Sequence, residues 1–223
     1  MTYILGCVCK DGIALIADRK IVYGGYQIQY RDKLIIVDDS IVIGASGDVS
    51  LFDTFRERIR GLVEEYRQSR DINFFMSKIG EITKKVNGEY EYLLHSRDFD
   101  LLIALRSSHG ILLRYLYPDG NFEDVPTFRV IGLGEPYGLI FLRKLWHSGI
   151  TMVEAAELGY RIITYIEKFE LNGSVGLGSN GRPQILFMSN DGRLRKASES
   201  LLTKLHESSN EWLLRYENHL KKV

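Results

Sequence analysis

The sequence predicts an α+β protein in which two antiparallel sheets pack face to face and helices cover their outer faces, a four-layer αββα sandwich. Strand-like stretches come in runs, and pairs of amphipathic helices separate these runs. A strict alternation of single strands and single helices is missing, which disfavours a doubly wound parallel sheet. No linker rich in Pro, Ser or Gly divides the 223 residues, so we expect residues 1–223 to form a single domain.

Short strands open the chain. The first 45 residues carry four of them, predicted over residues 3–9, 13–17, 33–37 and 41–45. Lys10-Asp11-Gly12 joins the first two and is typical of a hairpin turn. Tyr23-Gly24-Gly25 predicts a further turn, and Asp38-Asp39-Ser40 joins the second pair of strands.

Two amphipathic helices follow the strands. Apolar residues recur at helical spacing between Phe52 and Tyr66, with Arg and Glu between them, and Asp48 is placed to cap this helix. A second helix is predicted to begin near Asp71 and to end around Asn87-Gly88.

The second half repeats the scheme. Strands are predicted at 101–104, 111–116 and 128–131, and a third helix from Gly132-Leu133-Gly134 to Ser148-Gly149. Thr151-Met152-Val153-Glu154 is a capping box, so a fourth helix should begin there and run to about Phe169. Late strands at 184–188 and 194–196 flank the turn Asn190-Asp191-Gly192, and an amphipathic helix closes the chain from Glu199 to Leu220.

The composition excludes several classes of function. With 29 Lys+Arg against 29 Asp+Glu the net charge is zero, which argues against nucleic-acid and anionic-membrane partners. No apolar run approaches the ~18 residues of a membrane span, and the first residues lack the pattern of a signal peptide. The two cysteines, Cys7 and Cys9, are therefore expected to be reduced thiols of a cytoplasmic protein.

Neither a metal nor a cofactor is expected. The two cysteines have no second Cys or His pair to complete a metal site, and the five histidines show no H-E-x-x-H spacing. Residues 176–181 fit G-x-G-x-x-G, but they do not lie between a first strand and its crossover helix, which disfavours dinucleotide binding.

Thr2 is the first candidate for catalysis. It follows the initiator Met1 and is small enough for that residue to be trimmed. A terminal threonine carries its hydroxyl and a free α-amine on one residue, and an amine with a pKa near ~8 can accept the hydroxyl proton at neutral pH. The alternative is an ordinary first residue of a strand.

Three further residues support that chemistry. Lys33 opens the third predicted strand, and a buried ammonium beside Thr2 would lower the pKa of its hydroxyl or amine. Asp18 ends the second strand and is the anion that could hold this lysine. The backbone N–H of Gly47, after the fourth strand, could face an oxyanion. Each also has a simpler interpretation, as a solvated charge at a strand end or a turn glycine.

Together these residues resemble the start of a 20S proteasome β-type subunit. Thr2 with Gly6, Lys10-Asp11-Gly12, Ala17-Asp18, Lys33 and Ser46-Gly47-Asp48 carry the resemblance. The family consists of N-terminal-nucleophile hydrolases with an αββα sandwich and needs no cofactor. The resemblance implies that Thr2 is the nucleophile and its α-amine the base, that Lys33 tunes the pKa, that Asp18 orients Lys33 and that the Gly47 N–H binds the oxyanion.

The second half of the chain departs from the family. The family has Gly-Ser-Gly where this chain has Gly132-Leu133-Gly134, and Leu133 has no hydroxyl. The family also has Asp-x-x-Ser-Gly after the fourth helix; Glu170 with Ser174, or Ser179 alone, are the possible substitutes. The Arg usually found two residues after the aspartate corresponds to Lys20.

Three functions therefore remain open. The first is a threonine-type peptidase or amidohydrolase that acts on peptides or proteins and forms a homo-oligomer or ring assembly. The second is an acyl-transferring ligase or amidase on the same fold. The third is a non-catalytic proteasome-like subunit that serves in assembly.

Overall fold

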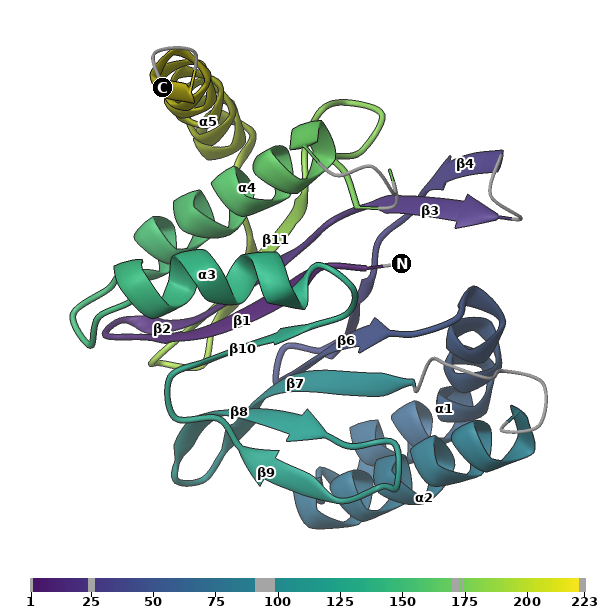
Figure 1. Ribbon diagram of the computed structural model, residues 1–223. Helices are drawn as coiled ribbons and strands as arrows, with labels where there is room; N and C mark the ends of the chain where they lie inside the picture. Colours follow the sequence, from purple (N-terminus) through teal and green to yellow (C-terminus); the bar gives the residue numbers. More distant parts are fainter. Residues whose placement is uncertain (1, 24–26, 91–98, 170–172, 174, 221–223) are drawn as a thin grey trace.

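Two five-stranded antiparallel sheets lie face to face between two layers of helices, as Figure 1 shows. The structure is a computed structural model that describes residues 2–23, 27–90, 99–169, 173 and 175–220. The predicted α+β sandwich is thereby confirmed.

The first sheet contains the first two strands of the chain. Its strand order is β10-β1-β2-β11-β12. The strands are β1 (Ile4–Cys9), β2 (Gly12–Ala17), β10 (Phe128–Ile131), β11 (Gln184–Ser189) and β12 (Leu194–Lys196). β1 and β2 form the hairpin that the sequence predicts, with Ile4 opposite Ala17 and Cys9 opposite Gly12.

The second sheet has the order β5-β6-β7-β8-β9. Its strands are β5 (Leu34–Asp38), β6 (Ile41–Ser46), β7 (Asp100–Ser107), β8 (Gly110–Leu116) and β9 (Phe122–Asp124). A separate two-stranded ribbon of β3 (Lys20–Tyr23) and β4 (Gln27–Tyr30) connects the two sheets and projects from the body.

The helices cover the outer faces. α1 (Val49–Ser69) and α2 (Ile72–Tyr90) pack on the second sheet. α3 (Glu135–Leu145) and α4 (Met152–Phe169) pack on the first sheet, and α5 (Glu199–Leu220) packs against α4. Apolar side chains fill three layers, one under each helix layer and one between the sheets, where Ile4, Val42 and Leu102 meet. Burial of this apolar surface is the main force that holds the four layers together.

Two predicted helix starts have the expected caps. The Asp48 carboxylate accepts a hydrogen bond from the Ser50 N–H at 2.8 Å, which begins α1. The Thr151 hydroxyl accepts from the Glu154 N–H at 3.2 Å, while the Glu154 carboxylate accepts from the Thr151 N–H at 2.7 Å. The second arrangement is the reciprocal capping box that the sequence predicts.

Other boundaries differ from the prediction. Six strands, not four, precede the first helix, because β3 and β4 are strands of only four residues that pair outside the two main sheets. β9 is also additional, a short edge strand whose three residues are all exposed. α3 ends at Leu145 because Trp146 takes an extended conformation, so Ser148-Gly149 lies in the following turn. α2 continues through Gly88 to Tyr90.

Candidate active site

Thr2 is held at the entry to β1 by the backbone of its neighbour Tyr3. The Tyr3 N–H donates to the Asp18 carboxylate at 2.8 Å, and the Tyr3 carbonyl accepts from the Asp18 N–H at 3.0 Å. Thr2 is 5% exposed. The end of β2 therefore fixes where the first residues of the chain lie.

Two glycines make room for Thr2 on the opposite side. The Gly134 N–H donates to the Thr2 carbonyl at 3.2 Å. Gly132 has a φ of 95°, and a Cβ there would lie 2.2 Å from the Thr2 carbonyl oxygen. A Cβ on Gly134 would lie 2.7 Å from the Tyr3 ring. Side chains at 132 and 134 would thus displace Thr2 and Tyr3.

Lys33 and Asp18 form a buried ion pair beside Thr2. The Lys33 ammonium donates to the Asp18 carboxylate and to the Lys20 carbonyl, each at 2.7 Å. The side chains of Lys33 and Asp18 are 5% and 0% exposed. The Gly176 N–H also donates to Asp18, at 3.3 Å. Removing one partner of such a buried pair leaves an uncompensated charge, so the two residues depend on each other.

Burial sets the direction of both pKa shifts. It lowers the pKa of Lys33, and the nearby Arg31 charge adds to this effect while the Asp18 carboxylate opposes it. It raises the pKa of Asp18, against the pull of Lys33 and of the N–H groups of Tyr3 and Gly176. A lysine with a lowered pKa that lines a pocket together with a threonine is an arrangement typical of a reactive site.

Gln184, at the start of β11, clamps this arrangement from the first sheet. Its side-chain oxygen accepts from the N–H groups of Lys33 and Leu34 at 2.9 and 2.8 Å, and its amide donates to the Leu34 carbonyl at 3.0 Å. The clamp joins segments about 150 residues apart in sequence. No local pattern in the sequence marks Gln184, so its role was not predicted.

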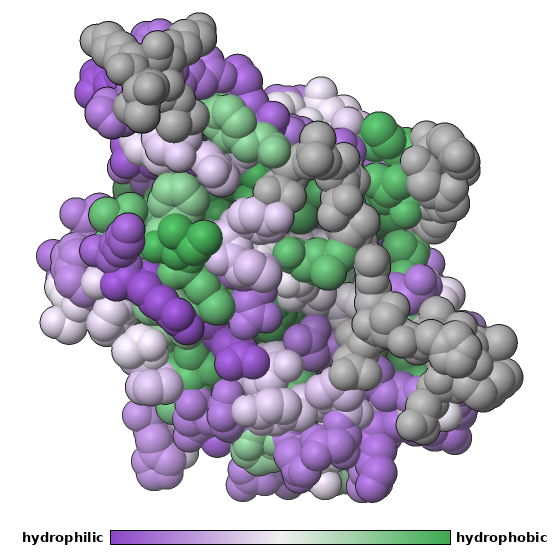
Figure 2. All heavy atoms as spheres, viewed as in Figure 1, coloured by the Kyte–Doolittle hydropathy of each residue, from purple (hydrophilic) through white to green (hydrophobic). Residues whose placement is uncertain are grey.

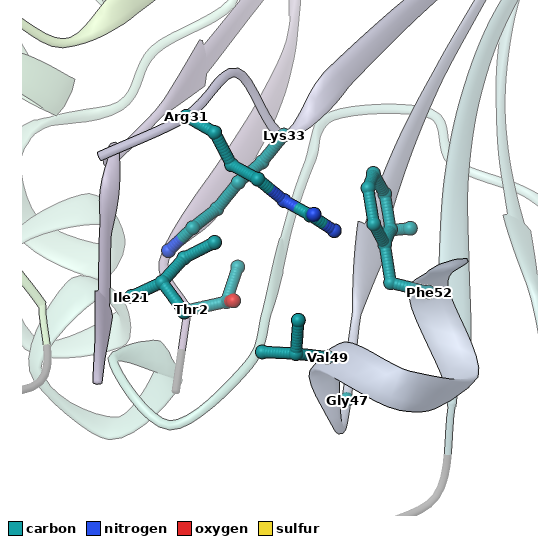
Figure 3. Close-up of a pocket in the computed structure, with 8 residues that line it drawn as sticks. Thr2, Ile21, Arg31, Lys33, Gly47, Val49 and Phe52 are labelled. Atoms are coloured by element: carbon teal, nitrogen blue, oxygen red, sulfur yellow. The ribbon is translucent and has the colours of Figure 1, made fainter. Parts of the chain in front are cut away.

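One pocket collects three of the four predicted residues. Thr2, Lys33 and Gly47 line it together, as Figure 3 shows. Its other lining residues are Ile21, Arg31, Ala45, Val49 and Phe52. Asp18, the fourth predicted residue, lies behind Lys33 and contacts it directly.

The pocket wall carries a second cation. The Arg31 guanidinium lies over the Phe52 ring, 4.6 Å from its centroid, and donates to the Asp53 carboxylate at 2.7 Å. Both contacts fix Arg31 across the pocket from Val49. The pocket therefore combines apolar walls with two positively charged side chains.

Gly47 forms the turn between β6 and α1. Its φ of 132° lies in the region that favours glycine. Asp48 caps α1 immediately afterwards, so Gly47 precedes a helix N-terminus, where N–H groups and the helix dipole favour negative charge.

Of the three predicted substitutes for the family's second motif, only Ser179 lies among the described residues. Glu170 and Ser174 lie outside the described residues. Ser179 is exposed in a turn and is not among the residues that line the pocket of Thr2 and Lys33. Leu133 is 41% exposed.

Glu167 reaches the same loop and was not predicted. Its carboxylate accepts from the Leu177 N–H at 3.2 Å, and a Cβ on Gly176 would lie 2.5 Å from that carboxylate oxygen. It therefore ties α4 to the segment that donates to Asp18. Its position one turn after the buried Ile163 was the available signal, a carboxylate at the edge of an apolar helix face.

Two further searches concern the described residues alone. No helix among them is both long and apolar enough to cross a bilayer. No group of three or more His, Cys, Asp or Glu side chains in that part of the chain is arranged to hold a metal ion.

The chain matches a known protein family and several of its members. Residues 2–175 match the family described as "Proteasome subunit". The chain is 28% identical to proteasome subunit alpha of Methanocaldococcus jannaschii over 171 residues, which cover 73% of this chain and 63% of that protein. It is 26% identical to proteasome subunit beta 1 of Thermococcus kodakarensis over 168 residues, 73% of this chain and 78% of that protein. The match thus spans less than two thirds of the first relative.

Solved structures share the fold across nearly the whole chain. The Anbu (Gly-1) mutant from Hyphomicrobium sp. strain MC1 superposes with a TM-score of 0.78 at 17% identity, covering 100% of this chain and 98% of that one. Anbu (ancestral beta-subunit) from Yersinia bercovieri superposes with a TM-score of 0.76 at 16% identity, covering 97% of both chains. With the family match over residues 2–175, these findings show that the chain belongs to the proteasome subunit family.

Proposed function

We propose that the protein is an N-terminal threonine hydrolase that cleaves peptide or amide bonds with Thr2 after removal of Met1. One observation carries the proposal: Thr2, Lys33 and Gly47 line a single pocket, and Lys33 is paired with the buried Asp18. Family membership supports it.

The proposed chemistry uses this chain's own groups. The Thr2 α-amine takes the hydroxyl proton as the oxygen attacks the carbonyl carbon of the substrate. The proton then passes to the leaving amine, and an ester forms on Thr2. Water, activated by the same amine, hydrolyses the ester and restores the hydroxyl. The Lys33 ammonium stabilises negative charge on the Thr2 oxygen, and the Gly47 N–H stabilises the oxyanion.

The pocket is where a substrate side chain next to the cleaved bond would lie. Ile21, Ala45 and Val49 offer apolar contacts, and Arg31 adds a charge at the rim. Peptides or proteins are the proposed substrates, and the two free thiols fit a cytoplasmic protein.

Leu133 favours a second candidate. The family has a serine at this position, and its hydroxyl would assist the water that hydrolyses the ester. Without that hydroxyl, the acyl group could instead pass to an amine. The same observation supports a non-catalytic subunit. Acyl transfer predicts that probes form an adduct on Thr2 but that peptides are not hydrolysed. A non-catalytic subunit predicts that no adduct forms.

Assembly with further copies of the chain is also part of the proposal. Large apolar side chains are exposed on β4 and on α3; they are Ile28, Tyr30, Ile140 and Leu145, exposed by 50%, 45%, 58% and 52%. Figure 2 shows hydrophobic surface over both regions. Exposed apolar surface of this kind is typical of contacts between proteins.

Intact mass and covalent labelling test the proposal together. The natively expressed protein should lack Met1, and a peptide epoxyketone or β-lactone should add to Thr2. The Thr2→Ala variant serves as the unlabelled control. Retained Met1, or no adduct under conditions that label a known threonine peptidase, would count against catalysis by Thr2. Adduct formation without cleavage of fluorogenic peptides would favour acyl transfer.

A further inference from the structure

Asp100 is a partly buried acid that takes no part in the chemistry above. Asp100 opens β7 directly opposite Ser46, the last residue of β6. Opposite residues of an antiparallel pair point to the same face of the sheet. The preceding pairs contribute Leu102, Val42 and Ala104 to the core between the sheets, so Asp100 and Ser46 face into the same space.

Ser46 brings this pair to Thr2. The Ser46 side chain is buried, with 5% of the residue exposed. A Cβ on Gly132 would lie 2.9 Å from the Ser46 hydroxyl and 2.2 Å from the Thr2 carbonyl oxygen. The Ser46 hydroxyl and the Thr2 carbonyl therefore both lie against Gly132, the residue that precedes Leu133.

The surroundings hold Asp100 in place. The Tyr115 hydroxyl, from β8, donates to its carboxylate at 3.0 Å. The Arg129 guanidinium, from β10, lies over the Tyr115 ring, 4.0 Å from its centroid. The Glu135 carboxylate, at the start of α3, also faces this group.

These groups determine how Asp100 titrates. Burial raises its pKa to about 6, and the charge of Glu135 adds to the rise. The hydrogen bond from Tyr115 and the charge of Arg129 oppose it. Asp100 therefore changes charge close to neutral pH.

We propose that Asp100 and Ser46 form an acid–hydroxyl pair that positions Thr2, in place of the hydroxyl that Leu133 lacks. The inference rests on the proposed function of Thr2. The hydroxyl and the acid come from β6 and β7. The family's own motifs for this task correspond instead to the segments around residues 133 and 170–174. Asp100 acts through Ser46 and is a positioning residue.

The test compares variants of the full chain with Met1 removed. Asp100→Asn and Ser46→Ala remove the two groups, and Tyr115→Phe removes the hydrogen bond to Asp100. Asp124→Asn is the matched control, because this carboxylate is exposed on β9 and pairs with Arg114. The first readout is the rate of Thr2 labelling by a β-lactone between pH 5 and 9. The second is the pKa of the Thr2 α-amine, measured by NMR of the isotope-labelled threonine.

We expect an inflection near pH 6 in the wild-type labelling profile, absent in Asp100→Asn. Tyr115→Phe should move it to higher pH, because a hydrogen bond that favours the carboxylate is lost. Ser46→Ala should lower labelling about tenfold, and Asp124→Asn should match wild type. The α-amine pKa should fall by about half a unit or more in Asp100→Asn, since a nearby carboxylate favours the ammonium.

The two readouts separate the two proposals. If the wild type is labelled while Asp100→Asn and Ser46→Ala match it in both profile and amine pKa, the positioning role is overturned and the hydrolase stands. If the wild type is not labelled but the amine pKa still responds to Asp100→Asn, the hydrolase fails and the positioning role stands. An unchanged amine pKa in unlabelled protein overturns both.

Discussion

Thr2 is surrounded by two regions of the chain, residues 18–47 and residues 132–181. The first supplies charged and polar groups that contact each other directly: the Lys33 ammonium donates to Asp18 at 2.7 Å, and Gly47 shares the pocket of Thr2. The described part of the second region supplies mainly backbone groups. The N–H groups of Gly134 and Gly176 donate to the Thr2 carbonyl and to Asp18, and the side chain of Leu133 is 41% exposed.

The two regions thus perform two different tasks at the same site. Activation of a hydroxyl depends on charges at short range, and residues 18–47 provide them. Placement of the terminal residue depends on shape and backbone hydrogen bonds, and residues 132–181 provide those. A change in the second region should therefore alter how Thr2 is held more than whether its hydroxyl can be activated.

Loss of Lys33 should have the largest effect. Lys33→Met should lower Thr2 labelling roughly 10²–10⁴-fold, because the charge that favours the Thr2 alkoxide is lost. It should also reduce the free energy of unfolding by about 3–5 kcal/mol, since Asp18 is left buried without its cation. The double variant Asp18→Asn/Lys33→Met should recover much of the stability and none of the labelling. Lys78→Met, at an exposed pair on α2, is the control. If Lys33→Met were labelled at the wild-type rate, the Lys33 charge would not be needed to activate the Thr2 hydroxyl.

A side chain at Gly132 should break the second region. Gly132→Ala combines an unfavourable φ of 95° with a Cβ 2.2 Å from the Thr2 carbonyl oxygen. We expect a loss of about 2–4 kcal/mol in chemical denaturation, together with slower labelling. Gly61→Ala on α1 is the matched control, because no atom lies within 4 Å of its Cβ position and alanine favours helices by roughly 0.5–1 kcal/mol. Equal stability of the two variants would show that Thr2 is not packed against Gly132.

The two regions also differ in how far the sequence predicts them. Thr2, Asp18, Lys33 and Gly47 lie at predicted strand ends within fifty residues, and the resemblance to the family, carried by this short segment, implied that they form one site. Gln184 and Asp100 reach the site only because sheets pair and pack over long distances, and Gln184 contacts Leu34 across about 150 residues. Local periodicity carries no information on such contacts.

Helices and strands away from the site also differ in how far local sequence signals predict them. The capping box at Thr151 and the cap at Asp48 are local signals, and both are confirmed. The β3–β4 ribbon pairs outside the two main sheets, and each of its strands has only four residues, too few for a clear periodic signal. For Glu170 and Ser174 the proposed relay stays a prediction.

Asp100 should give a smaller effect with a distinctive pH dependence. Its pKa of about 6 lies above the ordinary value of 3.8, so the folded state binds the proton more tightly than the unfolded state. Stability contributed by this group is therefore present at pH 4 and is lost as the pH rises through 6. Between pH 4 and pH 7.5 the wild type should lose roughly 1–3 kcal/mol that Asp100→Asn does not lose. Urea denaturation at both pH values measures this, with Asp124→Asn as control. Parallel pH dependence in the wild type and Asp100→Asn would show that Asp100 is not desolvated.

Restoring a hydroxyl at position 133 should have the smallest effect, and it compares the two regions directly. If residues 132–181 mainly place Thr2, Leu133→Ser should change Thr2 labelling by no more than a few fold, because the charges around Lys33 are untouched. Hydrolysis of the ester should respond more than its formation, since that step needs an ordered water next to the amine. The comparison requires the burst and steady-state rates on a fluorogenic peptide, with Leu133→Ala as the control that removes the leucine without adding a hydroxyl. A selective gain in the steady-state rate for the serine variant would locate the altered step in deacylation. Equal rates for the serine and alanine variants would instead mean that position 133 lies too far from the amine to assist, as the 41% exposure of Leu133 suggests. That result would favour Ser46 and Asp100 as the source of the replacement group.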